Sequence, residues 1–347
     1  MKKLILVLAL LVLIAPTAHA MEFTAPPVPE SAEDLMPQEP ETFSEGLLKI
    51  LKEGLQRLQP VLAESSAICL SLIAITVLTS FVTAFPGANS GVTEFVGVLG
   101  ISAALLKPSA AMIHMGIRTV QELSGYGKLL LPVMTASLAA QGGTVSSAAL
   151  YTGTAIFDAV LCTLITNVIV PMIYLYLCIA VVCSAIGAPV LGQIKDSIKW
   201  VMTWGLKIVL YVFTGYLGIT GVVNGSADAM AVKAAKIAIS GAVPVVGSLI
   251  SDASETILVS AGIMKNAAGV YGMLALIALW IGPFIEIGAQ YLLLKLTAAV
   301  CSFFGTKAQV KLIKDFSGAM GMLLAMTGTV CLLLLISIIC YMKGVSG

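Results

Sequence analysis

The chain has 347 residues, of which 59% are hydrophobic and 11% are charged, and its formal net charge is +1 at pH 7. Soluble domains carry about a quarter charged residues, so this composition excludes a water-soluble globule. The near-neutral charge, without basic clusters, also argues against nucleic acid as a partner. Apolar runs near the ~20 residues needed to cross a bilayer recur along the chain. These runs are continuous and do not alternate, which disfavours a β-barrel and predicts an all-α, polytopic helical membrane protein.

Residues 1–20 have the pattern of a secretory signal peptide. Lys2 and Lys3 precede the apolar stretch LILVLALLVLI, and the small residues Ala18 and Ala20 form an A-x-A cleavage site. An uncleaved signal anchor is the alternative interpretation. Both interpretations predict that the chain continues on the extracytoplasmic side of the membrane.

Two further segments precede the first membrane helix. Residues 21–45 hold seven acidic residues, no basic residue and several prolines. This composition predicts a disordered extracytoplasmic arm, which we interpret as a spacer rather than a docking motif. Residues 46–62, GLLKILKEGLQRLQPVL, place leucines at steps of three and four and charges on the other face. They predict an amphipathic helix that lies on the membrane, on a partner or on the chain's own first membrane helix.

Residues 63–347 form the predicted membrane domain. Some of its apolar segments reach the length of a membrane crossing, whereas others are short or interrupted by Gly and Pro. The expected helices cover residues 66–85, 92–113, the short segment 128–141, two helices in 145–186, then 200–223, a second interrupted stretch from 242, 268–304 and 317–342. The total is six to ten membrane helices, some of them broken or re-entrant.

The basic residues suggest an orientation for these helices. Lysines are concentrated in two predicted loops, 187–199 and 305–315. The positive-inside rule therefore places both loops in the cytoplasm.

The interrupted segments suggest an internal repeat. When Pro132 is aligned with Pro244, Pro171 falls on Pro283, because each pair is separated by the same number of residues. The candidate repeat modules are residues 128–186 and 240–304. Repeated broken helices are typical of transporters. The two basic loops follow the modules at equivalent places, which favours parallel rather than inverted repeats.

Polar residues within the apolar runs are the candidate site, either as a polar pathway or as helix breaks. A carboxylate at membrane depth is costly unless it faces the protein interior or a pore, so a transport role and a structural pairing with a lysine both remain open. Helix capping is the alternative for the polar group near residue 252. The candidates are Asp158, Asn167, Asp252, Glu255, Lys265, Asn266 and Glu286, with the break positions Pro132, Gly142, Gly143, Pro171, Pro244 and Pro283.

Catalytic, metal and cofactor sites are not expected. The seven cysteines all fall in apolar runs without a C-x-x-C pair, so we interpret them as small buried hydrophobic residues. Beyond the signal peptide the chain has one histidine, His114, and no nucleophile–base pair accompanies the candidate acids. The sequence therefore predicts a protein that is not an enzyme.

Two long blocks carry a family resemblance. KAAKIAISGAVPVVGSLISDASETILVSAGIMKNAAGVYG and LLPVMTASLAAQGGTVSSAALY resemble the stage III sporulation protein AE family of endospore-forming Firmicutes. The layout of signal peptide, short extracytoplasmic region and many membrane helices is similar too. The resemblance implies a multi-pass protein of the mother-cell membrane around the forespore.

The same resemblance implies a function and partners. The protein would act as a channel or export-gate component of a mother cell–forespore transport complex that is needed after engulfment. Its partners would be other products of the stage III sporulation operon and a forespore-side protein, and a homo-oligomer is possible. A stand-alone secondary transporter and a membrane scaffold for ring proteins are the alternatives.

Overall fold

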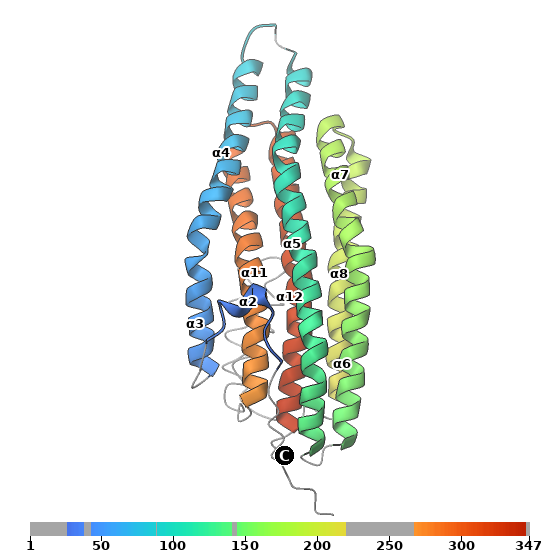
Figure 1. The fold of residues 1–347 in the computed structure, drawn as a ribbon. Coiled ribbons are helices and arrows are strands. Elements are labelled where there is room, and N and C mark those ends of the chain that lie inside the picture. Colours follow the sequence, from blue (N-terminus) through green and yellow to red (C-terminus); the bar gives the residue numbers. More distant parts are fainter. Residues whose placement is uncertain (1–25, 38–42, 88, 141–143, 220–266, 345–347) are drawn as a thin grey trace, which may run out of the picture.

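The computed structural model describes residues 26–37, 43–87, 89–140, 144–219 and 267–344 (Figure 1). The predicted all-α fold is confirmed, because every regular element in these ranges is helical. The elements are α2 (Glu30–Glu33), α3 (Phe43–Gln56), α4 (Leu58–Thr83), α5 (Ser90–Ala140), α6 (Thr144–Leu164), the π-helical turn η1 (Ile165–Ile169), α7 (Val170–Ile186), α8 (Pro189–Ile219), α11 (Ala267–Cys301) and α12 (Lys307–Gly344).

Six helices within the described residues are long and apolar enough to cross a membrane. This number is the lower end of the predicted range of six to ten. Several segments that were expected as separate helices are continuous. The six candidate spans are Phe43–Thr83, Ser90–Ala136, Ser147–Ile186, Pro189–Gly218, Gly269–Cys301 and Lys307–Met342.

Helix α5 shows why the segments merge. It runs for 51 residues through the predicted helix 92–113, the more polar residues that follow it and the short segment 128–141. Polar residues end a membrane crossing, but the linker residues do not break a helix. Pro132, predicted as a helix break, lies inside α5. At 1.5 Å per residue the helix is about 77 Å long, more than twice the ~30 Å of a hydrocarbon core.

Helices α6 and α7 form one rod joined by η1 instead of the two expected membrane helices. Val170 donates its N–H to the Ile165 carbonyl, five residues earlier, as in a π turn. Pro171 follows in the first turn of α7. Because proline lacks an N–H and its ring crowds the carbonyl four residues earlier, the wider π turn accommodates it without ending the rod. Pro283 lies inside α11, so the two aligned prolines differ in local structure.

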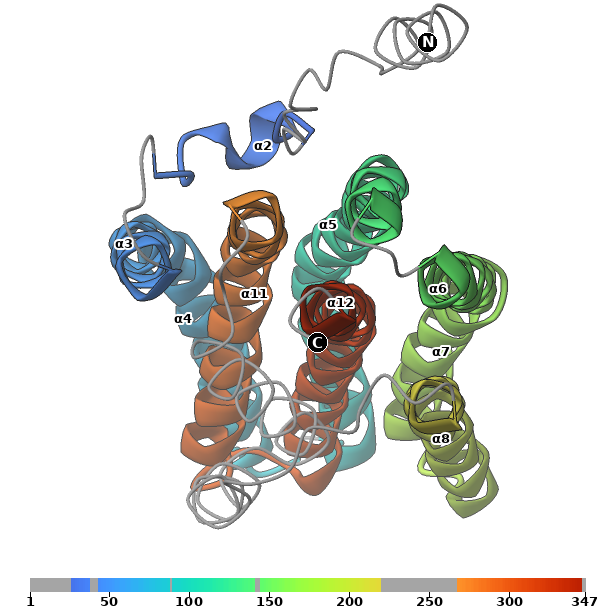
Figure 2. The ribbon, with the colours of Figure 1, turned by 90° about the horizontal axis from the view of Figure 1, so that it is seen from below.

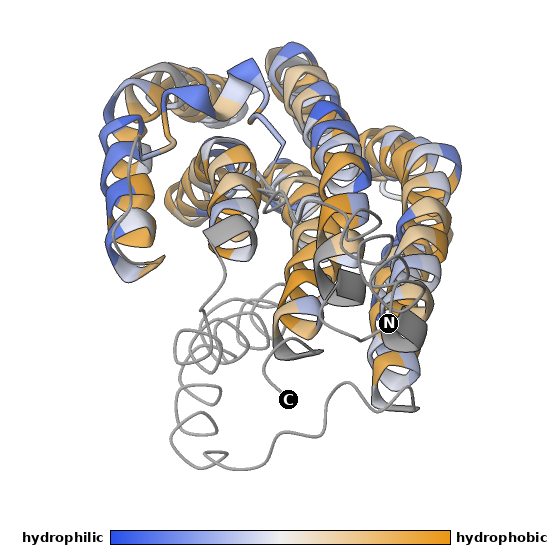
Figure 3. Ribbon diagram, turned by 60° about the horizontal axis from the view of Figure 1, so that its bottom comes forward, coloured by the Kyte–Doolittle hydropathy of each residue, from blue (hydrophilic) through white to orange (hydrophobic). Residues whose placement is uncertain are grey.

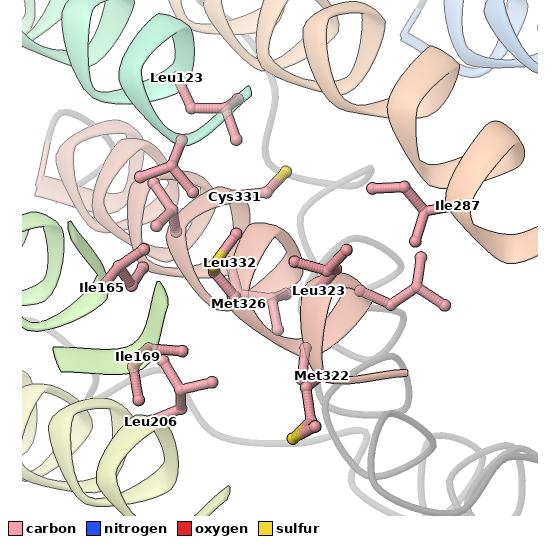
Figure 4. Packing of buried hydrophobic residues seen from close by; sticks show 14 of the residues in the cluster. Leu123, Ile165, Ile169, Leu206, Ile287, Met322, Leu323, Met326, Cys331 and Leu332 are labelled. Atoms are coloured by element: carbon pink, nitrogen blue, oxygen red, sulfur yellow. The ribbon is translucent and has the colours of Figure 1, made fainter. Parts of the chain in front are cut away.

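Helix α12 forms the centre of the bundle. Nearly all of its residues are buried, and it packs against α5, α6, α7, α8 and α11 (Figure 2). Its Met322, Leu323, Met326, Cys331 and Leu332 meet apolar side chains of the surrounding helices (Figure 4). Each large apolar side chain that becomes fully buried contributes about 1.5–3 kcal/mol relative to water, although in a bilayer the gain comes from close packing instead.

Short connections at one end of the bundle join α7 to α8 and α11 to α12 (Figure 1). Gly187 ends α7 in the left-handed region at φ +72°, and its N–H binds the Cys183 carbonyl at 2.9 Å. Thr306 and Gln309 start α12 with reciprocal backbone–side-chain hydrogen bonds, a capping box. Most residues of the two predicted basic loops are therefore helical, but both regions lie at the same end, as the predicted topology requires.

The segments before α4 differ in part from the prediction. Of residues 21–45, which we expected to be disordered, Glu30–Glu33 forms α2, and Ala32 and Leu35 are buried against the bundle. Helix α3 packs mainly on α11, with Ile50 fully buried, rather than on the first membrane helix. Figure 3 shows hydrophilic residues along α2 and α3 on the side away from the bundle.

Candidate polar sites in the helical bundle

Asp158 is buried between α5 and α6, with 2% of its surface exposed. Its carboxylate accepts a hydrogen bond from the Ser124 hydroxyl at 2.6 Å and has the Cys162 thiol at 3.9 Å. Lys128 lies close enough to interact with it electrostatically. The structure therefore gives Asp158 local partners, and the closest of them is a hydroxyl of α5 and not a lysine.

A second buried carboxylate joins α7, α8 and α12. Asp315 forms an ion pair with Lys195, and the Tyr176 hydroxyl donates to its other oxygen at 3.3 Å. The side chain of Lys195 is 3% exposed and that of Asp315 is 12% exposed. The Lys195 ammonium also lies 5.9 Å from the centre of the Tyr176 ring, within the range of a cation–π contact. The ion pair fixes the relative positions of three helices.

This ion pair was missed in the sequence analysis. Lys195 was assigned to a cytoplasmic loop, and Asp315 to the end of the next basic loop. Both residues lie in helices that continue beyond the apolar runs. Paired charges of opposite sign near the ends of two predicted helices were a usable signal, but 120 residues separate them in the chain.

The remaining described candidates do not join these two sites. Asn167 is exposed on η1, and Glu286 is half-buried on α11, three residues after Pro283. Helix α11, which carries Glu286, and helix α6, which carries Asp158, lie on opposite sides of α12 (Figure 2). Gly142, Gly143, Pro244, Asp252, Glu255, Lys265 and Asn266 lie outside the described residues.

A third polar feature lies on the surface of α5. Lys107, His114, Gln121 and Lys128 recur every seven residues, and Arg118 lies on the same side of the helix. All five side chains are exposed. With the small residues Ala111 and Gly125 between them they form the α5 polar face (residues 107, 111, 114, 118, 121, 125 and 128). Figure 3 shows hydrophilic residues on α5 next to α2.

In the sequence the α5 polar face is a series of polar residues that recur every seven positions. Most of these residues fall between the expected helices 92–113 and 128–141, and their spacing has a meaning only if the helix is continuous. The continuous α5 places them in a row on the side opposite to the buried residues Val120, Leu123 and Leu130. The described part of the chain thus combines an apolar interior, two buried carboxylates with partners, and one exposed polar row.

These features define a class: an all-helical, multi-pass membrane protein whose helices surround one buried helix. The family model for stage III sporulation protein AE matches residues 32–344. This match covers most of the chain, and the chain belongs to that family, as the sequence resemblance predicted.

A curated relative agrees with the family assignment. Stage III sporulation protein AE of Bacillus subtilis (strain 168) is 24% identical over 193 residues, which cover 56% of this chain. The aligned region spans about half the relative's own length, 48%. No solved structure matches the chain.

Proposed function

We propose that the chain is a membrane channel or export-gate component of a transport complex between the mother cell and the forespore. Membership of a sporulation family supports the cellular role. The transport path would run between several copies of the chain, and a single copy would supply one wall of it. The partners would be the membrane and other proteins of the same sporulation operon, with one partner on the forespore side.

The observation that carries this proposal is the way α12 fills the bundle. A stand-alone transporter of this size needs a polar cavity between its helices near the middle of the membrane. Here the central helix is buried by apolar side chains from five neighbouring helices (Figure 4). The two buried carboxylates in the described residues are each held by groups nearby. A path between copies fits this arrangement better than a path through one copy.

A second observation favours a channel component over a scaffold. A scaffold that only holds ring proteins needs polar surface at the ends of its helices, where those proteins would bind. The α5 polar face instead lies along the middle of α5, with apolar residues before and after it, rather than at an end of the helix. A long polar row is costly against lipid and useful beside water.

The first experiment is a clean deletion of the gene in its host, with counts of heat-resistant spores and microscopy of the arrest stage. We expect arrest after engulfment with small, collapsed forespores, and recovery when the intact gene is restored. Normal spore numbers would overturn the sporulation role. Native mass spectrometry of the protein extracted from sporulating cells tests the assembly. We expect several copies per particle, and a particle with one copy would contradict a path between copies.

Transport by the purified protein separates the alternatives. Liposomes that contain only this chain and accumulate a solute against its gradient would favour the stand-alone transporter. An assembly that supports sporulation equally well after the whole α5 polar face is replaced by leucine would favour the scaffold.

A further inference from the structure

We propose that the α5 polar face lines a water-filled path between copies of this chain and makes that path favour anionic solutes. This inference rests on the proposed channel function and adds the lining helix and the solute class. Its starting point is charge. Lys107, Arg118 and Lys128 are cationic, whereas the other members of the face, His114, Gln121 and two small residues, carry no negative charge.

The length of the face matches a membrane. From Lys107 to Lys128 the helix rises about 32 Å at 1.5 Å per residue. The hydrocarbon core of a bilayer is about 30 Å thick. The row is therefore long enough to cross a hydrocarbon core, and Arg118 lies near its middle.

The depth of the face can be read from its neighbours. Ser124 on α5 is hydrogen-bonded to Asp158 on α6, so these two residues lie at one level of the bundle. On α6 the residues Ile156 and Val160, on either side of Asp158, are 55% and 50% exposed. These side chains form a surface suited to lipid. At the same level α5 exposes Gln121 and Lys128.

Helix α8 extends the apolar surface around the same side. The ring of Phe157 on α6 lies 5.2 Å from that of Phe213 on α8, and the adjacent Val212 is 54% exposed. If lipid covers α6 and α8 at this level, it would also reach α5 unless protein or water intervenes. A lysine or arginine at the centre of a membrane helix costs about 2.5–3.5 kcal/mol on insertion scales. Three such residues in one row therefore exclude lipid.

The groups around the face include acidic residues, since α2, which contacts Glu122 through Ser31, also carries Glu30 and Glu33. At one end Lys128 has Asp158 nearby. The carboxylate of Glu122, beside the face, accepts a hydrogen bond from Ser31 of α2 at 2.9 Å. Among the residues that the structure describes, Arg118 forms no ion pair with a carboxylate. The middle of the row therefore keeps its positive charge.

Repulsion between like charges determines whether two α5 polar faces can be in direct contact. If copies of the chain assembled around these faces, cationic rows in direct contact would repel each other. Water and anions between the rows would reduce that repulsion, and rings of lysine and arginine are a known basis of anion selectivity in pores. We infer that copies are arranged with α5 toward a shared aqueous path and with α6, α7 and α8 toward lipid.

The test uses the full chain in native membranes. Of the native cysteines only Cys178 is exposed, so Cys178→Ala gives a background in which the other thiols are shielded in whole or in part. Into it we would introduce Gln121→Cys or His114→Cys, with Ile156→Cys and Val160→Cys as controls at the same level. The probe is a charged maleimide that does not cross membranes.

If water borders α5, the Gln121→Cys and His114→Cys variants should react with the maleimide about tenfold or more faster than the two controls, since solvent access limits thiol reactivity. A bis-maleimide should also link copies through Gln121→Cys and not through Ile156→Cys. Equal reaction rates at the two faces, or links only through Ile156→Cys, would overturn the assignment of the face.

Ion selectivity is measured on the purified protein in planar bilayers with a KCl gradient. We expect the reversal potential to indicate chloride preference, and Arg118→Glu to shift it toward potassium, whereas Arg118→Lys should leave it unchanged. A reversal potential that ignores Arg118→Glu would overturn the anion path. If the α5 cysteines are labelled rapidly but the unmutated protein carries no current, the result would overturn the channel function. The α5 polar face would then be exposed to water without lining a channel.

Discussion

The buried ion pair between Lys195 and Asp315 gives the sharpest test of the bundle. We consider three variants: Asp315→Asn, Lys195→Met, and the double variant Lys195→Met/Asp315→Asn. Both charged side chains are almost completely removed from solvent, at 3% and 12% exposure. Removal of one member of such a pair costs about 3–5 kcal/mol, because the other charge stays buried without compensation.

The two single variants should differ. Asp315→Asn leaves the Lys195 ammonium with the Tyr176 ring and no carboxylate, so we expect a loss near ~5 kcal/mol in the free energy of unfolding. Lys195→Met leaves Asp315 with the Tyr176 hydroxyl and with Lys311 nearby, so we expect a loss near ~3 kcal/mol. The double variant buries no charge at this position, and its stability should be within ~1 kcal/mol of the parent.

The assay is reversible unfolding of the purified protein in mixed micelles with increasing SDS, followed by circular dichroism. The three variants and the parent form a double-mutant cycle, and the expected coupling energy exceeds the additivity error of ~0.5 kcal/mol several-fold. Additive losses in the double variant would show that the two side chains do not interact. Losses below ~1 kcal/mol in both single variants would show that water reaches the pair.

Two further predictions concern packing. Ile50→Ala removes a fully buried side chain of α3 and should weaken the docking of α3 on α11 by about 2–5 kcal/mol. Leu48→Ala, at a position 65% exposed, should change this docking little. Limited proteolysis within α3 compares the two variants, and equal cleavage rates would contradict the docked position of α3. Gly153→Ala would drive a Cβ into the Tyr216 ring and should cost about 1–3 kcal/mol. At Gly215 an added Cβ would contact nothing within 4 Å apart from its own helix backbone, so Gly215→Ala should be neutral or stabilising in the same SDS titration.

The helical class and the membrane character could be predicted from the sequence, because both follow from local composition and from the lengths of apolar runs. The number of helices was harder, since polarity marks where a crossing ends and says little about where a helix ends. Arg118 and Glu122 interrupted the apolar pattern of α5 without interrupting its backbone. The prediction of a break at Pro132 was wrong as well, because this proline lies inside α5, which continues to Ala140.

The partners of the buried charges could be predicted only in part. The depth of Asp158 was evident from its position in an apolar run, and the structure confirms that it is buried. Its closest partner, Ser124, is one of many hydroxyl groups in the chain, and nothing local singles it out. The pairing of Lys195 with Asp315 depends on how α8 and α12 cross, which a single sequence does not encode in its local pattern.

The central position of α12 has a consequence for biogenesis. Among the described helices it is the last to leave the ribosome, yet it supplies the surface on which α5, α6, α7, α8 and α11 meet. Until it enters the membrane, those helices have only one another and lipid to pack against. The spaces beside small residues that contact α12, such as Gly116 and Gly127, would lack the α12 side chains that fill them in the complete bundle. Final compaction of the bundle therefore waits for the synthesis of α12, and a chain interrupted before α12 would present an open ring of helices to membrane proteases.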